Sequence, residues 1–76
     1  MFPTVDLNKK YIVPCTHKAD FDKLSKNAVK HTCELSIDKY GYITCRPNNI
    51  NYDNMVFTVD YFNWLLYTNY ITIAEQ

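Results

Sequence analysis

The sequence predicts a small α+β domain in which an antiparallel-rich sheet carries two helices packed on one face. Two short segments around a single glycine alternate apolar and polar residues, as strands do, while residues 59–69 repeat apolar residues at helical spacing. Apolar residues make up 47% of the chain and aromatic residues 16%. A chain of 76 residues has room for one dense core, so we expect residues 1–76 to form a single domain.

The clearest element is a hairpin formed by residues 32–38 and 42–46. The loop between them ends in Gly41, the only glycine, and follows Asp38, which suits a type I turn with a bulge. This turn sets a register of five pairs, which are Asp38 with Tyr42, Ile37 with Ile43, Ser36 with Thr44, Leu35 with Cys45, and Glu34 with Arg46. The apolar residues then share one face. They are Cys33, Leu35, Ile37, Ile43 and Cys45.

The remaining elements lie on both sides of this hairpin. Residues 11–13 predict a short strand ended by Pro14, and residues 19–30 predict a first helix with apolar residues near helical spacing. Residues 47–51 are a loop by composition, residues 55–57 suggest a further strand, and residues 70–74 suggest the last one. The predicted order is β-α-β-β-(β)-α-β, and a split β-α-β arrangement is the obvious candidate.

The second predicted helix has an unusual outer face. Thr58 is its expected N-cap and Asp60 suits its first turn. Steps of 100° per residue put the core-facing residues in one sector, namely Val59, Phe62, Leu65, Leu66 and Tyr70. The opposite sector, where an amphipathic helix is usually polar, holds Asp60, Tyr61, Trp64, Tyr67 and Thr68. Tyr and Trp dominate binding hot spots, so we expect a partner-binding surface at Asp60, Tyr61, Trp64 and Tyr67.

All cysteines and histidines fall between residues 15 and 45. Cys15, His17, His31 and Cys33 are the candidate ligands of a zinc ion, because thiolates and imidazoles suit that metal. The chain has no CxxC pair, and a helix over residues 19–30 would hold the two Cys/His pairs about 18 Å apart. The favoured interpretation is therefore that no metal or other cofactor is bound. A zinc-stabilised interaction module is the third functional hypothesis.

Catalysis is disfavoured for a related reason. Cys15 with His17 or His31 is the sole candidate for an activated nucleophile. The sequence has no nucleophile elbow or phosphate-binding loop, and its carboxylates are scattered. We therefore expect that the protein is not an enzyme.

Nucleic-acid binding is the second hypothesis. Lys39, Tyr40, Tyr42 and Arg46 lie on the outer side of the hairpin, where aromatic rings and cations would suit a single strand. The eight acidic side chains cancel the eight basic ones, however, and affinity for nucleic acid comes mainly from excess positive charge.

The N-terminus lacks a basic region followed by a long apolar stretch, so we expect no signal peptide and no membrane association. The odd number of cysteines then indicates free thiols in the cytoplasm. Seven of the eight cations are Lys, and Asn and Tyr are abundant. In this composition the chain resembles the small accessory proteins of tailed bacteriophages, which implies the host cytoplasm but no particular functional residue.

The favoured function is a non-catalytic protein-binding module. The phage-like composition makes a host protein the expected partner, such as a CRISPR effector of host defence or the transcription machinery. The protein would then act as an inhibitor or modulator of that partner. Homodimerisation is the competing interpretation of the aromatic helix face, because such a face can cover itself across a two-fold axis.

Overall fold

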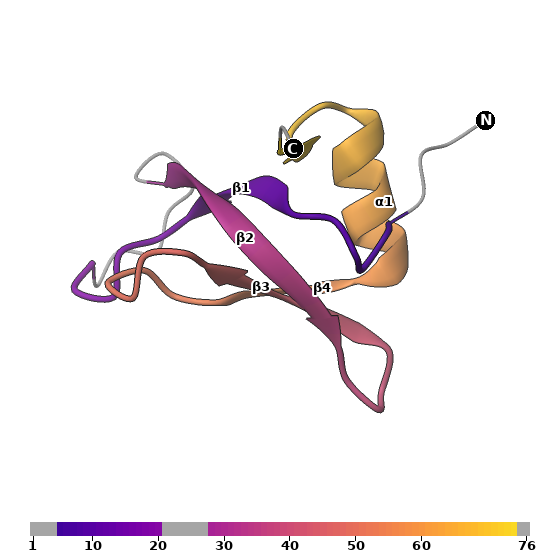
Figure 1. Ribbon diagram of the computed structural model, residues 1–76, viewed down its shortest axis with the longest axis horizontal. Coiled ribbons are helices and arrows are strands. Elements are labelled where there is room, and N and C mark those ends of the chain that lie inside the picture. Colours follow the sequence, from indigo (N-terminus) through magenta and orange to yellow (C-terminus); the bar gives the residue numbers. More distant parts are fainter. Residues whose placement is uncertain (1–4, 21–27, 75–76) are drawn as a thin grey trace.

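A computed structural model describes residues 5–20 and 28–74, which form one five-stranded sheet with a helix packed against it (Figure 1). The helix follows directly on the fourth strand of the chain, and a short fifth strand returns to the sheet beyond it. The elements are β1 Tyr11–Cys15, β2 Val29–Ile37, β3 Tyr42–Pro47, β4 Met55–Thr58, α1 Val59–Tyr67 and β5 Thr72–Ile73.

The sheet is antiparallel throughout the described residues. Its strand order is β4-β3-β2-β1-β5, and each of the four neighbouring pairs runs antiparallel. A split β-α-β arrangement contains a parallel pair joined by a crossover, so that candidate topology is wrong. Four strands, β1 to β4, instead lie side by side in chain order as an antiparallel meander.

The predicted hairpin between β2 and β3 is confirmed in detail. Four of the five predicted pairs are in the ladder, from Glu34 with Arg46 to Ile37 with Ile43. The fifth, Asp38 with Tyr42, lies at the mouth of the turn, where the Asp38 N–H donates to the Tyr42 carbonyl. Gly41 has a φ of 87°, in the left-handed region that a side chain disfavours, and its N–H donates to the Asp38 carbonyl. The Asp38 carboxylate accepts two further loop N–H groups, from Tyr40 and Tyr42, and so holds the turn closed.

The fold-class prediction is wrong in its first helix and therefore in its element order. The described residues contain one helix, α1, and residues 29 and 30, expected to end the first helix, begin strand β2. Residues 21–27 of the expected helix lie outside the described residues. The ladder with β1 explains the strand at this point, since Val29 pairs with Cys15 and His31 with Val13. Cross-strand hydrogen bonds and a β-branched Val favour the extended backbone there.

Strand β1 also continues past the residue expected to end it. Pro14 pairs with Lys30 inside the β1–β2 ladder and is buried. On the opposite side of β1, strand β5 pairs with residues 11 and 12 alone. Pro14 therefore lies where β1 has one neighbouring strand, so the missing N–H interrupts no ladder on the second side.

Helix α1 begins where predicted but ends earlier. The Thr58 hydroxyl accepts the N–H of Tyr61, which confirms the N-cap. At the other end Asn69 takes a φ of 65° and its N–H donates to the Leu66 carbonyl, while the N–H of Tyr70 reaches back to Leu65. These two bonds form a Schellman motif, and Asn is one of the few residues that enter its left-handed position readily.

This early end changes which residues enter the core. Tyr70, expected on the core face of the helix, lies beyond it and is 45% exposed, whereas Ile71 is fully buried. The last strand is shorter than the predicted residues 70–74, because the turn after α1 occupies residues 68–71. The N–H of Ala74 still donates to the Lys10 carbonyl and ties the described C-terminal end to the sheet.

The core lies between α1 and the face of the sheet on which the odd-numbered residues of β1, β2 and β3 lie. Phe62 is fully buried there, with its ring centroid 5.3 Å from that of Tyr11 in an edge-on contact. Leu35 is partly buried, while Ile37 is 47% exposed although it pairs with Ile43 as predicted. Figure 1 shows the reason, because the β2–β3 hairpin extends beyond the area that α1 covers.

Candidate functional site

The outer face of α1 carries a pair of exposed aromatic rings. Trp64 is 54% exposed and Tyr67 is 52% exposed. Their ring centroids lie 5.7 Å apart at an interplanar angle of 31°, within the range in which aromatic pairs attract each other. The two residues are three positions apart on the helix, so packing of one ring on the other reduces the freedom of both.

The other two predicted partner-binding residues flank this pair. Asp60 is exposed in the first turn of α1, and Tyr61 is half-exposed with its ring 6.0 Å from that of Phe57. On the opposite side Tyr67 borders a hollow of ≈ 340 Å³ between α1 and β5, which is also lined by Ile71 and Ile73. The structure thus joins the aromatic pair to a mainly apolar depression that the sequence did not reveal.

The N-terminal segment passes along a different side of the helix. The N–H of Val5 donates to the side-chain oxygen of Asn63 at 2.9 Å, and the Val5 side chain packs against the core. Asn63 lies about 100° around the helix from Trp64. This contact therefore closes the side next to the core and leaves the Trp64–Tyr67 pair half-exposed.

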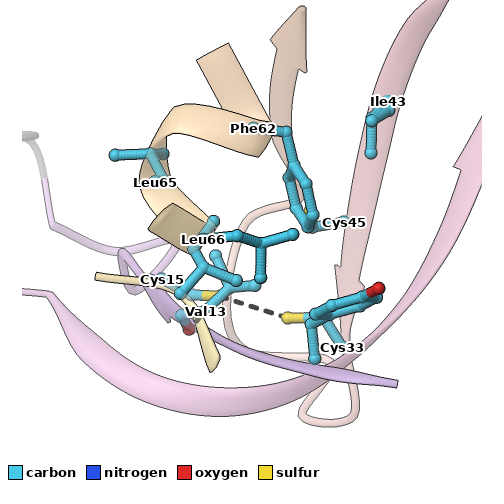
Figure 2. Close-up of a cluster of buried hydrophobic side chains, with 10 residues drawn as sticks. Val13, Cys15, Cys33, Ile43, Cys45, Phe62, Leu65 and Leu66 are labelled. Carbon is cyan, nitrogen blue, oxygen red and sulfur yellow. Dashed lines mark hydrogen bonds between the residues drawn. The ribbon is translucent and has the colours of Figure 1, made fainter. Parts of the chain in front are cut away.

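The three cysteines are free and fully buried. Cys15 and Cys33 face each other from β1 and β2, with their sulfur atoms 3.6 Å apart (Figure 2). The Cys15 thiol also donates to the Val13 carbonyl at 3.2 Å. The expectation that a helix separates residues 15–17 from residues 31–33 is wrong, because β1 and β2 are neighbouring strands.

Burial keeps the thiols of Cys33 and Cys45 protonated. It raises the pKa of Cys45 to about 12, since the low-dielectric core disfavours a thiolate. The hydrogen bond shared with Cys15, together with burial, raises the pKa of Cys33, while the same bond lowers that of Cys15. A thiol with no exposed surface cannot meet a substrate unless the core opens, so this geometry does not favour the nucleophile considered above.

The two histidines gather elsewhere, around one tyrosine. The centroid of the Tyr52 ring lies 5.0 Å from that of His17 and 4.1 Å from that of His31. Tyr52 and His17 also form an isolated antiparallel β-bridge. His17 accepts the N–H of Ala19 through Nδ1. Among residues 5–20 and 28–74, no three His, Cys, Asp or Glu side chains form a group that could hold a metal ion. The predicted ligands thus come together as two pairs and not as one tetrahedral set.

The candidate nucleic-acid residues of the hairpin divide into two groups. Tyr40 is 74% exposed at the tip, where the Lys39 ammonium lies 5.2 Å from its ring centroid. Arg46 lies farther along β3, on the face opposite the core, and forms an exposed ion pair with Glu34. Tyr42 shares that face and is 43% exposed. The four side chains therefore do not converge on one pocket.

A polar groove on the same outer face was missed by the sequence analysis. Two adjoining hollows of ≈ 410 and ≈ 330 Å³ share Lys10, Glu34 and Arg46, and a third of ≈ 320 Å³ shares Arg46 and extends to Lys18. Lys9 lines the first. The signal in the sequence was the Lys9–Lys10 pair directly before strand β1. Because Tyr11 pairs with Cys33, the preceding Lys10 lies beside Glu34 of β2.

Comparison of the chain with protein-family models, curated proteins and solved structures finds no significant match. Helix α1, the helix of the described residues, has nine residues and is too short to cross a membrane.

Proposed function

We propose that this protein is a non-catalytic binding module that docks on another protein through the outer face of α1. The observation that carries the proposal is the half-exposed Trp64–Tyr67 pair beside an apolar hollow. Large aromatic side chains that are already ordered lose little conformational entropy when a partner covers them. The adjoining hollow would receive an apolar side chain of that partner, as hot spots on two proteins tend to pair.

Two further features support the same surface. Asp60 adds one negative charge at the edge of the aromatic pair, which suits a Lys or Arg at the rim of a partner. The exposed aromatic residues Tyr61, Trp64 and Tyr67 lie on a helix whose opposite side is fixed in the core by Phe62. A rigid helix presents such anchors with little rearrangement on binding. The partner class that we propose is a host protein, on the phage-like composition of the chain.

The proposal is tested with a photo-crosslinking amino acid at position 68, beside the aromatic pair, followed by identification and purification of the captured protein. Binding of that protein is then measured for the wild type, for the double variant Trp64→Ala/Tyr67→Ala, and for Tyr40→Ala. Loss of the anchors should weaken binding by about 30-fold or more, since a hot-spot aromatic contributes about 2 kcal/mol or more. Tyr40→Ala removes a more exposed ring at the hairpin tip, far from α1 in the sequence, and should bind as the wild type does.

Two outcomes would count against the proposal. Unchanged affinity of the double variant would show that the outer face of α1 is not the docking surface. Sedimentation of the wild type tests self-association, the competing interpretation. A dimer that dissociates on the double substitution would mean that a second copy of the chain covers the aromatic pair.

A further inference from the structure

The charges of the described residues are unevenly distributed between the two faces of the sheet. Residues 5–20 and 28–74 contain six cations and six acidic side chains, so they are neutral as a set. The groove on the outer face is nevertheless lined by four of those cations and by one carboxylate, Glu34. The cations are Lys9, Lys10, Lys18 and Arg46. The described residues therefore have a local positive surface although their net charge is zero. At short range the local charge, and not the net charge, determines how strongly a polyanion is attracted.

The alternation of the strands places this groove on the opposite side of the sheet from α1. Arg46 is exposed between the buried residues Cys45 and Pro47 and pairs with Glu34, so the side chains of Arg46 and Glu34 point away from the core. Lys30 is exposed on the same face of β2, opposite Pro14. The positive surface thus continues from the segment before β1 across three neighbouring strands.

The rest of the lining is rich in hydrogen-bonding groups. Ser36 and Thr44 contribute hydroxyls to the first hollow, Thr32 to the second, and asparagine amides line all three. Hydroxyls, amides and ammonium groups are the usual donors to phosphate oxygens and sugars. An aromatic side chain, Tyr52, lines the third hollow, and its ring is already packed against His31. Base stacking would therefore contribute less here than contacts with the backbone.

We propose that this outer groove binds single-stranded nucleic acid by its sugar–phosphate backbone, with little dependence on base sequence. The occupant follows from charge complementarity, from the donor-rich lining and from the shape. An open groove across several strands can follow a flexible chain, whereas recognition of a duplex usually needs an element that projects into a DNA groove. This site lies on the face opposite the Trp64–Tyr67 pair, so it is independent of the protein-docking proposal.

Glu34 is the one carboxylate among the residues that line the groove. Its ion pair with Arg46, and the proximity of Lys10, lower the pKa of this carboxyl, so it stays ionised at neutral pH. Its negative charge opposes a phosphate and occupies the guanidinium of Arg46. Replacement of Glu34 by Gln should therefore strengthen binding, whereas loss of lysines from the groove should weaken it.

The test measures fluorescence anisotropy of a labelled oligothymidylate of about 12 nucleotides, between about 50 and 200 mM salt. Wild-type protein should bind with an affinity that falls as salt rises. The Lys9→Gln/Lys10→Gln variant should bind about tenfold more weakly, with a salt slope smaller by about 1.4, because each phosphate contact on a single strand contributes about 0.7. Glu34→Gln should bind more tightly than the wild type.

Lys39→Gln is the matched control, since it also removes a positive charge but lies at the hairpin tip outside the groove. It should bind within about twofold of the wild type, because an exposed charge so distant is largely screened. Thermal unfolding of each variant checks that the fold is intact. The proposal fails if the wild type shows no salt-dependent binding, if Lys39→Gln loses as much affinity as the double variant, or if a duplex of the same length binds more tightly.

Discussion

The sulfur atoms of Cys15 and Cys33 meet at 3.6 Å in the core because each leans back along its own strand toward the carbonyl two residues earlier. Those earlier residues, Val13 and His31, are register partners in the β1–β2 ladder. The two thiols therefore converge above one pair of the sheet, although neither cysteine is the other's direct partner. Figure 2 shows this contact among the buried side chains beneath α1.

The first prediction follows from that burial. All three thiols should be inert toward an aromatic disulfide reagent in the native protein and should react when the chain is unfolded in guanidinium chloride, because reaction needs an accessible thiolate. Absorbance of the released thiolate counts the reactive groups. Cys45→Ala should lower the count after unfolding from three to two. Rapid modification of the folded wild type would contradict the buried arrangement.

The second prediction concerns alkaline pH. Up to the ordinary thiol pKa of 9.0 Cys45 is protonated in both the folded and the unfolded chain, whereas between 9.0 and about 12 the unfolded thiol ionises and the buried one does not. The free energy of unfolding should therefore fall by about 1.4 kcal/mol per pH unit from this group. Urea unfolding at pH 8 and pH 10 measures the loss. Cys45→Ala keeps every other titrating group, so it should lose about 1.4 kcal/mol less than the wild type, and equal losses would refute the assignment.

The hairpin shows how far local pattern can specify structure. Alternation of apolar residues fixed the faces of β2 and β3, and the turn chemistry of Asp38 and Gly41 independently gave the same register. Agreement between two signals with different physical origins is what made this element predictable. The N-cap of α1 at Thr58 was predictable for a similar reason, since capping depends on adjacent residues.

The elements that sequence reasoning missed depend on distant partners. Val29 and Lys30 suit the end of a helix in composition, but they form a ladder with Cys15 and Pro14 across the sheet. Short-range propensity contains no information about such a partner. The outer groove was missed for the same reason, because Lys10 meets Glu34 and Arg46 through the pairing of three strands. The aromatic pair of α1, by contrast, follows from helical spacing within one element.

The third prediction tests the backbone of the β2–β3 turn. Gly41→Val should destabilise the protein by roughly 1 kcal/mol or more, because a β-branched residue strongly disfavours a φ of 87°. Apart from Gly41 and its two chain neighbours, nothing lies within 4 Å of the position that a Cβ would take, so the cost would come from backbone strain and not from a clash. Gly41→Asn is the control and should cost less, since Asn tolerates the left-handed region. Equal melting temperatures for all three proteins would exclude the left-handed turn.

The fourth prediction separates the two sides of α1 by their effect on stability. Phe62→Ala should lower the free energy of unfolding by about 3–5 kcal/mol, because it removes a fully buried ring that contacts Tyr11 and leaves a cavity. Trp64→Ala and Tyr67→Ala should each cost far less, about 0.5 kcal/mol for an exposed position plus the loss of their mutual contact, which contributes about 0.5–1.5 kcal/mol.

A double-mutant cycle on Trp64 and Tyr67 makes this last comparison quantitative. Once either ring is gone the contact no longer exists, so the second substitution should cost less than it does alone, and the double variant should cost less than the two single costs together. Urea unfolding of the four proteins measures that coupling. Strict additivity would show that the rings do not pack on each other in solution. A loss of several kcal/mol from Trp64→Ala alone would instead place the indole inside the core, and the outer face of α1 would then have no aromatic anchor to offer a partner.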